Sequence, residues 1–273
     1  MECRLDRITV HYEDIGEGRP LVVIPGWPDE GRVPADYLEP VFEDRTGWRR
    51  FYLDLPGRGQ TRGEPWITTN DQVLEIVLDV LDRVVGSGRF ALAGHSAGAY
   101  LARGIVHERG DRVVGLLQVV PELDRGDEDW PAHMTLASDP RLLERIEAEL
   151  GPAFADTFGS FFVVQSAAVY ERIRPLWPAL RNADRTFLDA LESTLSFEVD
   201  PPAMPFARPA LFLLGRQDSV TGYRAPFDLA AAYPRATIAI LDRAGHGLAW
   251  EQDGLTRALI GEWLDRLEAE PPA

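Results

Sequence analysis

The sequence contains no lysine, so all 28 of its strongly basic residues are arginines. Enzymes that form a Schiff base, including those that use pyridoxal phosphate, need a lysine amine. The P-loop of nucleotide hydrolases likewise needs a lysine beside the phosphates. Both enzyme classes are therefore excluded.

Cysteine is almost as scarce, because Cys3 is the only one in the chain. One cysteine cannot form an intramolecular disulfide, a CxxC redox pair or a cysteine-rich zinc site. We expect Cys3 to be an incidental thiol near the terminus.

Long apolar runs are absent, since no uninterrupted stretch approaches the roughly 20 residues that cross a bilayer. The first seven residues, Met-Glu-Cys-Arg-Leu-Asp-Arg, contain no apolar core of a secretory signal. We therefore expect a cytoplasmic protein that is not embedded in a membrane.

Positive charge is also in short supply, because 44 acidic residues outnumber the arginines and give a formal net charge of −16. Such a chain repels nucleic-acid phosphates and anionic membrane surfaces. We expect neither nucleic acid nor a membrane as a partner.

The 273 residues, 45% of them hydrophobic and 26% charged, have globular composition and suffice for one large core with an insertion. Short β-rich runs alternate with amphipathic segments, which predicts a mostly parallel sheet joined by crossover helices. The expected strands are 8–12, 21–24, 50–53, 90–93, 113–120, 210–214 and 237–241. The expected helices are 70–85, with Asn70 as its N-cap, 97–108, 225–232 and 252–267.

Strand signals vanish between residues 122 and 205, where helical or loop segments rich in aromatic residues take over. We expect this stretch to be an inserted helical cap. The core domain is then formed by 1–121 together with 206–273.

The pentapeptide Gly94-His95-Ser96-Ala97-Gly98 follows an apolar strand and opens a helix. This context is typical of a nucleophile elbow, in which a serine lies on a tight, strained turn at the carboxyl end of the sheet. The alternative is a small-residue turn that merely packs a helix on a strand. We predict that Ser96 is a catalytic nucleophile.

An oxyanion that develops beside Ser96 needs two hydrogen-bond donors. The N–H of Ala97, at the start of the following helix, is the first candidate. The second donor is expected from the loop Ile24-Pro25-Gly26-Trp27-Pro28. Because proline has no N–H, Gly26 or Trp27 must donate, and we favour Trp27.

A serine hydroxyl needs a histidine to take its proton, and the sequence has five histidines. Four of them lie in a strand, in the elbow, at a helix end or in the cap. His246 remains, in a glycine-flanked loop after the last strand, and we predict it as the base. Activity should therefore fall with pH through about 6 to 7.

A carboxylate must orient the histidine, and Asp218 follows an apolar strand in Gly215-Arg216-Gln217-Asp218. The order Ser96, Asp218, His246 matches the order in which this kind of fold places its triad. Asp218 could instead cap a turn. Glu122, directly after the strand that ends near Pro121, is the alternative acid.

Together with the elbow, the segments 52–61, 215–218 and 244–246 resemble the capped α/β-hydrolase superfamily over nearly the whole chain. The resemblance implies an α/β fold with an eight-stranded sheet, an inserted cap and an acyl-enzyme mechanism. It also implies Ser96, Asp218 and His246 as the triad, with the Trp27 and Ala97 amides as the oxyanion hole. Serine at position 96, where other branches carry aspartate, argues against an alkyl-enzyme mechanism.

The aromatic cap predicts a mostly apolar pocket for a small-molecule substrate, although each ring could equally belong to the cap's own core. Carboxylic ester hydrolysis without cofactor or metal is the expected reaction, and a homodimer is left open. The alternatives are a C–C bond hydrolase for diketone-like compounds, in which Arg172 and Arg174 would hold a carboxylate, and a ligand receptor that does not turn over. The expected pocket residues are Trp27, His95, Phe161, Phe162 and Trp177.

Overall fold

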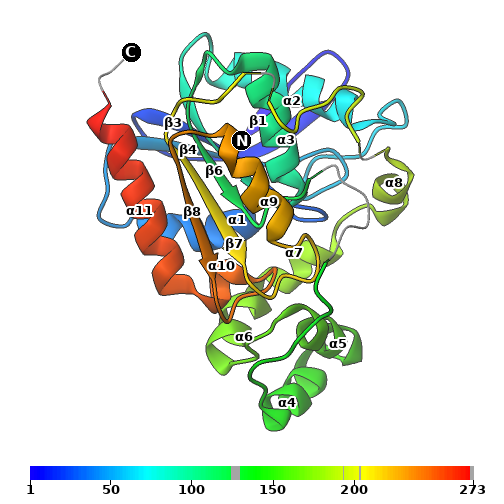
Figure 1. Cartoon of the computed structure of the whole chain (residues 1–273). Coiled ribbons are helices and arrows are strands. Elements are labelled where there is room, and N and C mark those ends of the chain that lie inside the picture. The colour runs from blue at the N-terminus through cyan, green and yellow to red at the C-terminus, as the bar shows by residue number, and fades with distance from the viewer. Residues whose placement is uncertain (124–129, 193, 203, 271–273) are drawn as a thin grey trace.

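A central sheet of eight strands organises the chain in a computed structural model that describes residues 1–123, 130–192, 194–202 and 204–270 (Figure 1). The strand order is β1-β2-β4-β3-β5-β6-β7-β8, and all pairs are parallel except those of β2 with β1 and β4. The predicted eight-stranded, mostly parallel α/β sheet is confirmed. The strands are β1 (Glu2–Arg4), β2 (Thr9–Gly16), β3 (Arg19–Ile24), β4 (Trp48–Leu53), β5 (Phe90–His95), β6 (Val113–Val119), β7 (Ala210–Gly215) and β8 (Ala236–Leu241).

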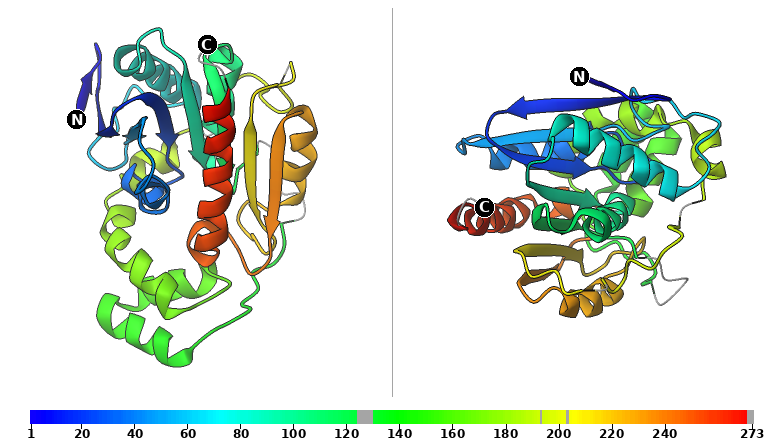
Figure 2. Two further views of the ribbon diagram at one scale, coloured as in Figure 1. Left: turned by 90° about the vertical axis from the view of Figure 1, so that its left-hand side faces the viewer. Right: turned by 90° about the horizontal axis from the view of Figure 1, so that it is seen from above.

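Helices cover both faces of the sheet, and the alternation of side chains along each strand supplies both interfaces. In β5, Ala91 and Ala93 join one buried cluster, while Phe90 and Leu92 join the other. The first face is covered by α1 (Arg32–Leu38) and α11 (Asp253–Ala269). The second is covered by α2 (Asn70–Val84), α3 (Ala97–Arg109) and α9 (Arg224–Leu229), as Figure 2 shows from two directions.

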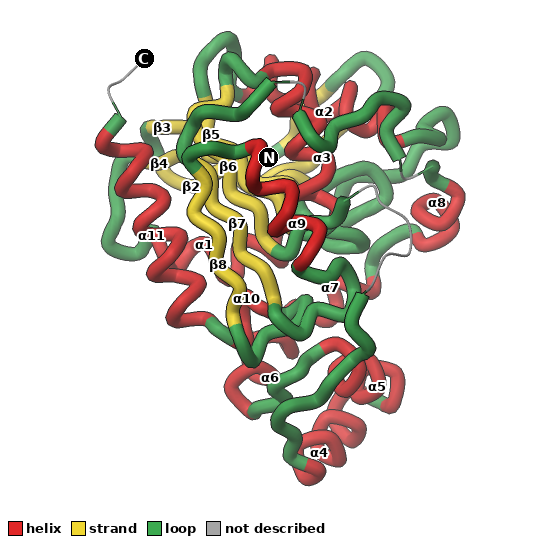
Figure 3. Tube along the Cα trace, viewed as in Figure 1, coloured by secondary structure: helices red, strands yellow, loops and turns green. Residues whose placement is uncertain are grey.

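The described residues between β6 and β7 form helices and loops, with isolated bridges as their only strand-like pairing. Their helices α4, α5 and α6 lie together beyond the end of the sheet, next to α10 (Leu248–Glu251) (Figures 1 and 3). The boundaries of the cap at 122 and 205 stay a prediction. The helical elements of this stretch are α4 (Pro140–Leu150), α5 (Pro152–Phe161), α6 (Ala167–Ile173), η2 (Arg174–Leu176), α7 (Trp177–Arg181) and α8 (Arg185–Ala190).

Most aromatic side chains of α4 to α6 are internal to the structure. Phe154, Phe158 and Tyr170 are buried in the same apolar cluster as Trp250 of α10. The alternative interpretation of the cap aromatics, as packing residues, therefore holds for Tyr170, whereas Phe154 and Phe158 also line a cavity beside Ser96.

Several short elements are not predicted by the periodicity of the sequence. The edge strand β1 and helix α1 have three and seven residues, too few to show a clear pattern, and Pro34 lies inside α1. The N-cap of α2 is Thr69 rather than Asn70, because Thr69 and Gln72 form a reciprocal capping box.

Arg103 of α3 is fully buried and joins three parts of the core. Its Nε and Nη2 donate to the two carboxylate oxygens of Asp200 at 2.7 and 2.8 Å. Its Nη1 donates to Gln118 Oε1 on β6 at 2.8 Å, and Nη2 also donates to the Glu122 carbonyl at 2.6 Å. The helix that follows Ser96 is thereby held to β6 and to the end of the cap.

No helix in the described part of the chain combines the length and the apolar character that a membrane crossing requires.

Replacing Arg103 by leucine should lower the free energy of unfolding by about 3–5 kcal/mol, because Asp200 stays buried without its partner. Urea unfolding followed by circular dichroism measures this loss. The Arg103→Leu/Asp200→Leu double variant should recover part of it. As a control, Arg109→Leu on the same helix breaks only exposed ion pairs and should cost less than about 1 kcal/mol. Equal losses from Arg103→Leu and Arg109→Leu would contradict the account.

Candidate active site

Ser96 lies on a sharp turn between β5 and α3, with φ 53° and ψ −122°. This conformation is strained for a residue with a side chain, so neighbouring groups must hold it in place. The Ser96 N–H donates to the Val119 carbonyl at 2.9 Å, and its carbonyl accepts from Ala99 N at 2.9 Å and Glu122 N at 3.2 Å. The strained turn that the sequence predicts is present.

The glycines on both sides of Ser96 allow backbones to touch. A Cβ at Gly94 would lie 2.5 Å from the Cα of Ala99, and one at Gly98 would lie 2.2 Å from the carbonyl oxygen of Pro25. Any side chain at either position would push strand, helix or loop apart. The elbow and the loop after β3 are therefore packed backbone to backbone.

The structure brings Ser96, His246 and Asp218 into one hydrogen-bonded chain from the ends of β5, β8 and β7. His246 Nε2 lies 3.0 Å from Ser96 Oγ, and His246 Nδ1 lies 2.9 Å from Asp218 Oδ2. Asp218 also accepts from the N–H groups of Val220 and Thr221 at 2.8 and 3.0 Å. All three predicted residues are buried.

Glu122, the alternative acid, follows β6 on the other side of the elbow. The structure engages its backbone, with the N–H bonded to Ser96 and the carbonyl to Arg103. The carboxylate that faces His246 Nδ1 at hydrogen-bond distance is that of Asp218.

The electrostatics of the pair favour proton uptake by His246. Burial lowers the pKa of His246, but the charge and hydrogen bond of Asp218 outweigh it, with smaller contributions from Asp29 and Glu122. The His246 pKa is therefore above its ordinary value. Burial raises the pKa of Asp218, while the charge and hydrogen bond of His246 and two backbone N–H groups bring it below its ordinary value.

Ala97 directly follows Ser96, and the loop that carries Trp27 lies against Ser96. Ala97 is the first residue of α3, where a backbone N–H has no acceptor within the helix. On the other side, a Cβ at Gly26 would lie 3.2 Å from Ser96 Cβ, which places the loop that carries Trp27 against the serine. Trp27 is 45% exposed, and the centroid of its ring lies 4.7 Å from Arg185 Cζ. The donor roles of the two amides stay a prediction.

A cavity of about 390 Å³ opens beside Ser96 and His246, between the loop after β3 and helices α5 and α7. Its lining is mostly apolar, and five of its residues are those predicted from the sequence. They are Trp27, His95, Phe161, Phe162 and Trp177.

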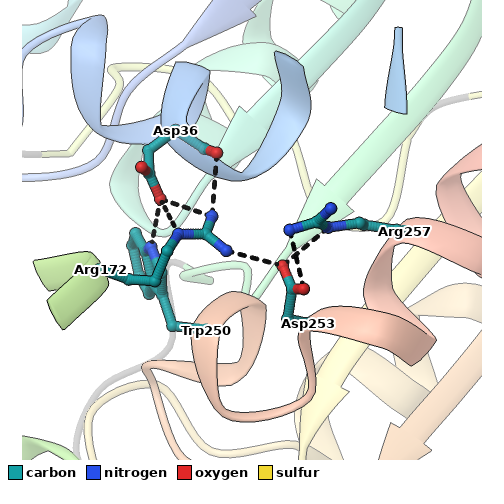
Figure 4. A network of polar contacts seen from close by, with 5 residues as sticks. All are labelled: Asp36, Arg172, Trp250, Asp253 and Arg257. Carbon is teal, nitrogen blue, oxygen red and sulfur yellow. Dashed lines mark hydrogen bonds and ion pairs between the residues drawn. The ribbon is translucent and has the colours of Figure 1, made fainter. Parts of the chain in front are cut away.

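Arg172 connects α6 to α1 and α11 (Figure 4), and it is not among the residues that line the cavity. It donates to Asp36 Oδ2 of α1 at 2.7 Å and to Asp253 Oδ1 of α11 at 3.0 Å. Trp250 Nε1 also donates to Asp36, and Arg257 pairs with Asp253. Arg172 is therefore neutralised by two carboxylates.

Arg174 is likewise paired, with Glu149 at 3.8 Å and Glu171 at 3.2 Å. The expectation that Arg172 and Arg174 could hold a substrate carboxylate is not supported, because acidic side chains already occupy both guanidinium groups. Arg185 is the arginine found in the cavity wall.

Glu251 of α10 ties the end of α5 to the loop that carries His246. Its Oε1 accepts from the N–H groups of Val163 and Val164 at 2.6 and 2.9 Å, and its Oε2 accepts from Gly245 N at 2.7 Å. One carboxylate thus connects the histidine loop to the end of α5, where Phe161 and Phe162 form the roof of the cavity.

Sequence reasoning missed Asp29, Arg185 and Trp250 as cavity residues. Asp29 directly follows the Gly26-Trp27-Pro28 stretch, so its place after the oxyanion loop was a usable signal. Arg185 and Trp250 come from distant segments that only the fold brings together. Within the described residues, no group of three or more His, Cys, Asp or Glu side chains could hold a metal ion.

A sequence model described as "Alpha/beta hydrolase family" matches residues 21–258. The chain is 24% identical over 272 residues to the AB hydrolase superfamily protein YisY of Bacillus subtilis (strain 168), covering 94% of this chain and 96% of that protein. It is 27% identical over 244 residues to the pimeloyl-(acyl-carrier protein) methyl ester esterase of Stenotrophomonas maltophilia (strain K279a), with coverages of 87% and 89%.

Solved structures share the same architecture. An alpha/beta superfamily hydrolase from Oenococcus oeni PSU-1 matches with a TM-score of 0.87 and 26% identity, over 98% of this chain and 100% of that chain. A thermophilic esterase from Thermogutta terrifontis matches with a TM-score of 0.68 and 22% identity, over 95% and 94%. The second likeness concerns the fold alone.

The acid limb of the pH profile should reflect the raised pKa of His246. Because the neutral imidazole is lost as pH falls through that pKa, kcat/KM for an aryl ester should decline with a midpoint above the ordinary value of about 6.5. In Asp218→Asn, burial still lowers the pKa of His246, but the carboxylate charge that raises it is gone. The midpoint should therefore move to lower pH. A wild-type midpoint at or below about 6.5 would contradict the electrostatic account.

Removing the negative charge of Glu251 should weaken the connection between the cavity roof and the histidine loop. In Glu251→Gln, the amide nitrogen cannot accept from Gly245 N. The free energy of unfolding should therefore fall by about 1.5–3 kcal/mol. The amide hydrogen of Gly245 should also exchange with solvent faster than in wild type. Glu262→Gln on α11, whose partner Arg266 is partly exposed, is the matched control and should change stability by less than about 1 kcal/mol. Unchanged exchange at Gly245 would argue against this role.

Proposed function

The chain belongs to the alpha/beta hydrolase family, and we propose that it is a serine esterase that cleaves carboxylic esters of small, mostly apolar molecules through an acyl-enzyme. The observation that carries the proposal is the hydrogen-bonded chain from Ser96 Oγ through His246 to Asp218, which begins at a strained turn beside the cavity. A buried serine with that geometry is an activated nucleophile.

In the first half-reaction, Ser96 Oγ attacks the ester carbonyl carbon while His246 Nε2 takes the hydroxyl proton. The carbonyl oxygen becomes an oxyanion that accepts hydrogen bonds from the Trp27 and Ala97 amides. His246 then gives its proton to the leaving alkoxide, so that an alcohol departs and the acyl group stays on Ser96. Asp218 keeps the imidazole oriented and stabilises its charged form.

In the second half-reaction, His246 takes a proton from a water molecule whose oxygen attacks the acyl-enzyme carbonyl. The tetrahedral intermediate collapses with return of the proton to Ser96 Oγ, and the carboxylic acid leaves. The same histidine and the same two amides therefore serve both steps.

The size and lining of the cavity support a small substrate. A volume of about 390 Å³ lies at the lower end of the range for small-molecule sites, and its aromatic walls suit an apolar acyl or alkoxy group. The Stenotrophomonas maltophilia relative is named as a methyl ester esterase, which supports ester cleavage rather than C–C cleavage. The pairing of Arg172 and Arg174 with carboxylates also speaks against the C–C alternative.

Replacing Ser96 by alanine should abolish turnover, because the nucleophile is removed while the cavity is kept. We expect kcat for a responsive ester in a short-chain ester panel to fall by about 10³-fold or more, and a fluorophosphonate probe should label wild type but not Ser96→Ala. Full turnover by Ser96→Ala would contradict the proposal. Labelling of the wild type without hydrolysis of any ester would favour a ligand receptor.

Variants of Asp218 and Glu122 identify which carboxylate orients His246. Asp218→Asn should lower kcat by about 10⁴-fold, because the imidazole loses its orienting charge. Glu122→Gln keeps the backbone bonds to Ser96 and Arg103 and should change kcat by no more than about threefold, less than 1 kcal/mol. The opposite pattern would assign the acid to Glu122.

A further inference from the structure

The cavity wall contains a buried carboxylate that takes no direct part in the hydrolytic steps, although its charge helps to raise the pKa of His246. The Asp29 side chain lines the cavity and only 8% of the residue is exposed. Among the residues that the structure describes, no hydrogen-bond donor reaches its oxygens. His95 Nδ1 lies 3.7 Å from Oδ2, too far for a hydrogen bond.

The local fold does not need this carboxylate. The Asp29 N–H donates to the Gly26 carbonyl at 3.0 Å, and the Gly31 N–H is satisfied by Asp54 Oδ1 at 2.9 Å. Helix α1, which starts immediately afterwards, has no side-chain cap. An unpaired buried charge is costly, so its presence calls for a partner that enters from the cavity.

His95 completes a polar corner beside Asp29. It is 3% exposed, and neither ring nitrogen has a hydrogen-bond partner within the described chain. Its ring is held at centroid distances of 5.8 Å from Tyr37, 6.2 Å from Trp250 and 5.9 Å from His246. Burial lowers the pKa of His95 to about 3, so the imidazole is neutral and offers one donor and one acceptor.

This polar corner is close to the reacting serine. A Cβ placed on Gly26 would lie 3.0 Å from Asp29 Oδ2 and 3.2 Å from Ser96 Cβ. A substrate group that contacts Asp29 is therefore only a few bonds from the carbonyl carbon that Ser96 attacks.

The surrounding charges favour a neutral partner over a cation. Burial raises the pKa of Asp29 to about 6, while the charges of His246, Arg58 and Arg185 act in the opposite direction. Asp29 is thus an anion at neutral pH, and the positive charges of Arg58 and Arg185 already act on it. A hydroxyl group can donate to Asp29 without adding positive charge next to His246.

We propose that Asp29 forms a subsite for a hydroxyl group of the substrate, so that the preferred esters are hydroxy esters with the hydroxyl two or three bonds from the scissile carbonyl carbon. This inference rests on the proposed esterase function. It adds a specificity determinant to a cavity that is otherwise lined mainly by aromatic and aliphatic side chains.

The test compares kcat/KM for ethyl 3-hydroxybutanoate, as each enantiomer, with kcat/KM for ethyl butanoate. Wild type should favour one hydroxy enantiomer by about 10-fold or more, because a hydrogen bond to a charged group is formed only with that substrate. Asp29→Leu should reduce this preference to about twofold or less, since no acceptor remains. Asp29→Asn, which keeps an acceptor oxygen but no charge, should give an intermediate preference.

Two further measurements separate this role from a structural one. Glu30→Gln, at the next acidic residue, which pairs with Arg32 at 3.3 Å, should leave the substrate preference unchanged. The unfolding temperature of Asp29→Asn should equal or exceed that of wild type, because an unpaired buried charge is removed. A fall in unfolding temperature together with an unchanged preference would assign Asp29 to stability and overturn the inference.

Failure of the subsite and failure of the esterase proposal look different. If ethyl butanoate is hydrolysed but wild type shows no preference for either hydroxy enantiomer, the subsite is wrong and the esterase stands. If wild type hydrolyses none of the three esters and a fluorophosphonate does not label Ser96, the esterase proposal fails and the subsite falls with it.

Discussion

The backbone of Ser96 is the constraint on which the site depends. Its φ of 53° costs on the order of 1–3 kcal/mol, and the turn persists because bonds to Val119, Ala99 and Glu122 hold it from three sides. The same turn aims the start of α3 at the cavity and presents Oγ to His246. Relaxing it would move the nucleophile, one expected oxyanion donor and the neighbouring loop together.

Arginine makes the polar connections between distant segments in a chain that has no lysine. Arg103 binds a carboxylate, an amide and a carbonyl inside the core, and Arg172 joins α6 to α1 and α11. The flat guanidinium can donate in several directions at once, which an ammonium group on a flexible stem does less well. With 44 acidic residues in the chain, many guanidinium groups find carboxylates, and this consumes positive charge that could otherwise bind an anionic substrate.

The cavity divides into an aromatic part and a polar corner, and each has a different consequence. Phe161 and Phe162 belong to the segment that Glu251 ties to the histidine loop, so the roof and the base are held by one side chain. Asp29 follows the oxyanion loop, and His95 directly precedes Ser96 at the end of β5. Apolar contacts in the aromatic part do not fix the orientation of a substrate, whereas a hydrogen bond at the polar corner would.

The sequence alone determined the elbow, because a sharp turn between a strand and a helix needs small residues where Gly94 and Gly98 stand. It also determined the parallel sheet, whose central strands are short apolar runs, and it placed Ser96, Asp218 and His246 after strands that end at one edge. Short elements such as β1 and α1 were missed, since three to seven residues carry no readable period.

Only the tertiary structure decided which charged groups meet. Whether Arg172 enters the cavity or binds Asp36 depends on the packing of α6 against α1, which are far apart in the chain. The burial of Asp29 and the presence of Arg185 in the cavity wall have the same origin. Local sequence specifies elements through periodicity and turn residues, but the partners and the exposure of a polar side chain are set by distant segments, and these exist together only after folding.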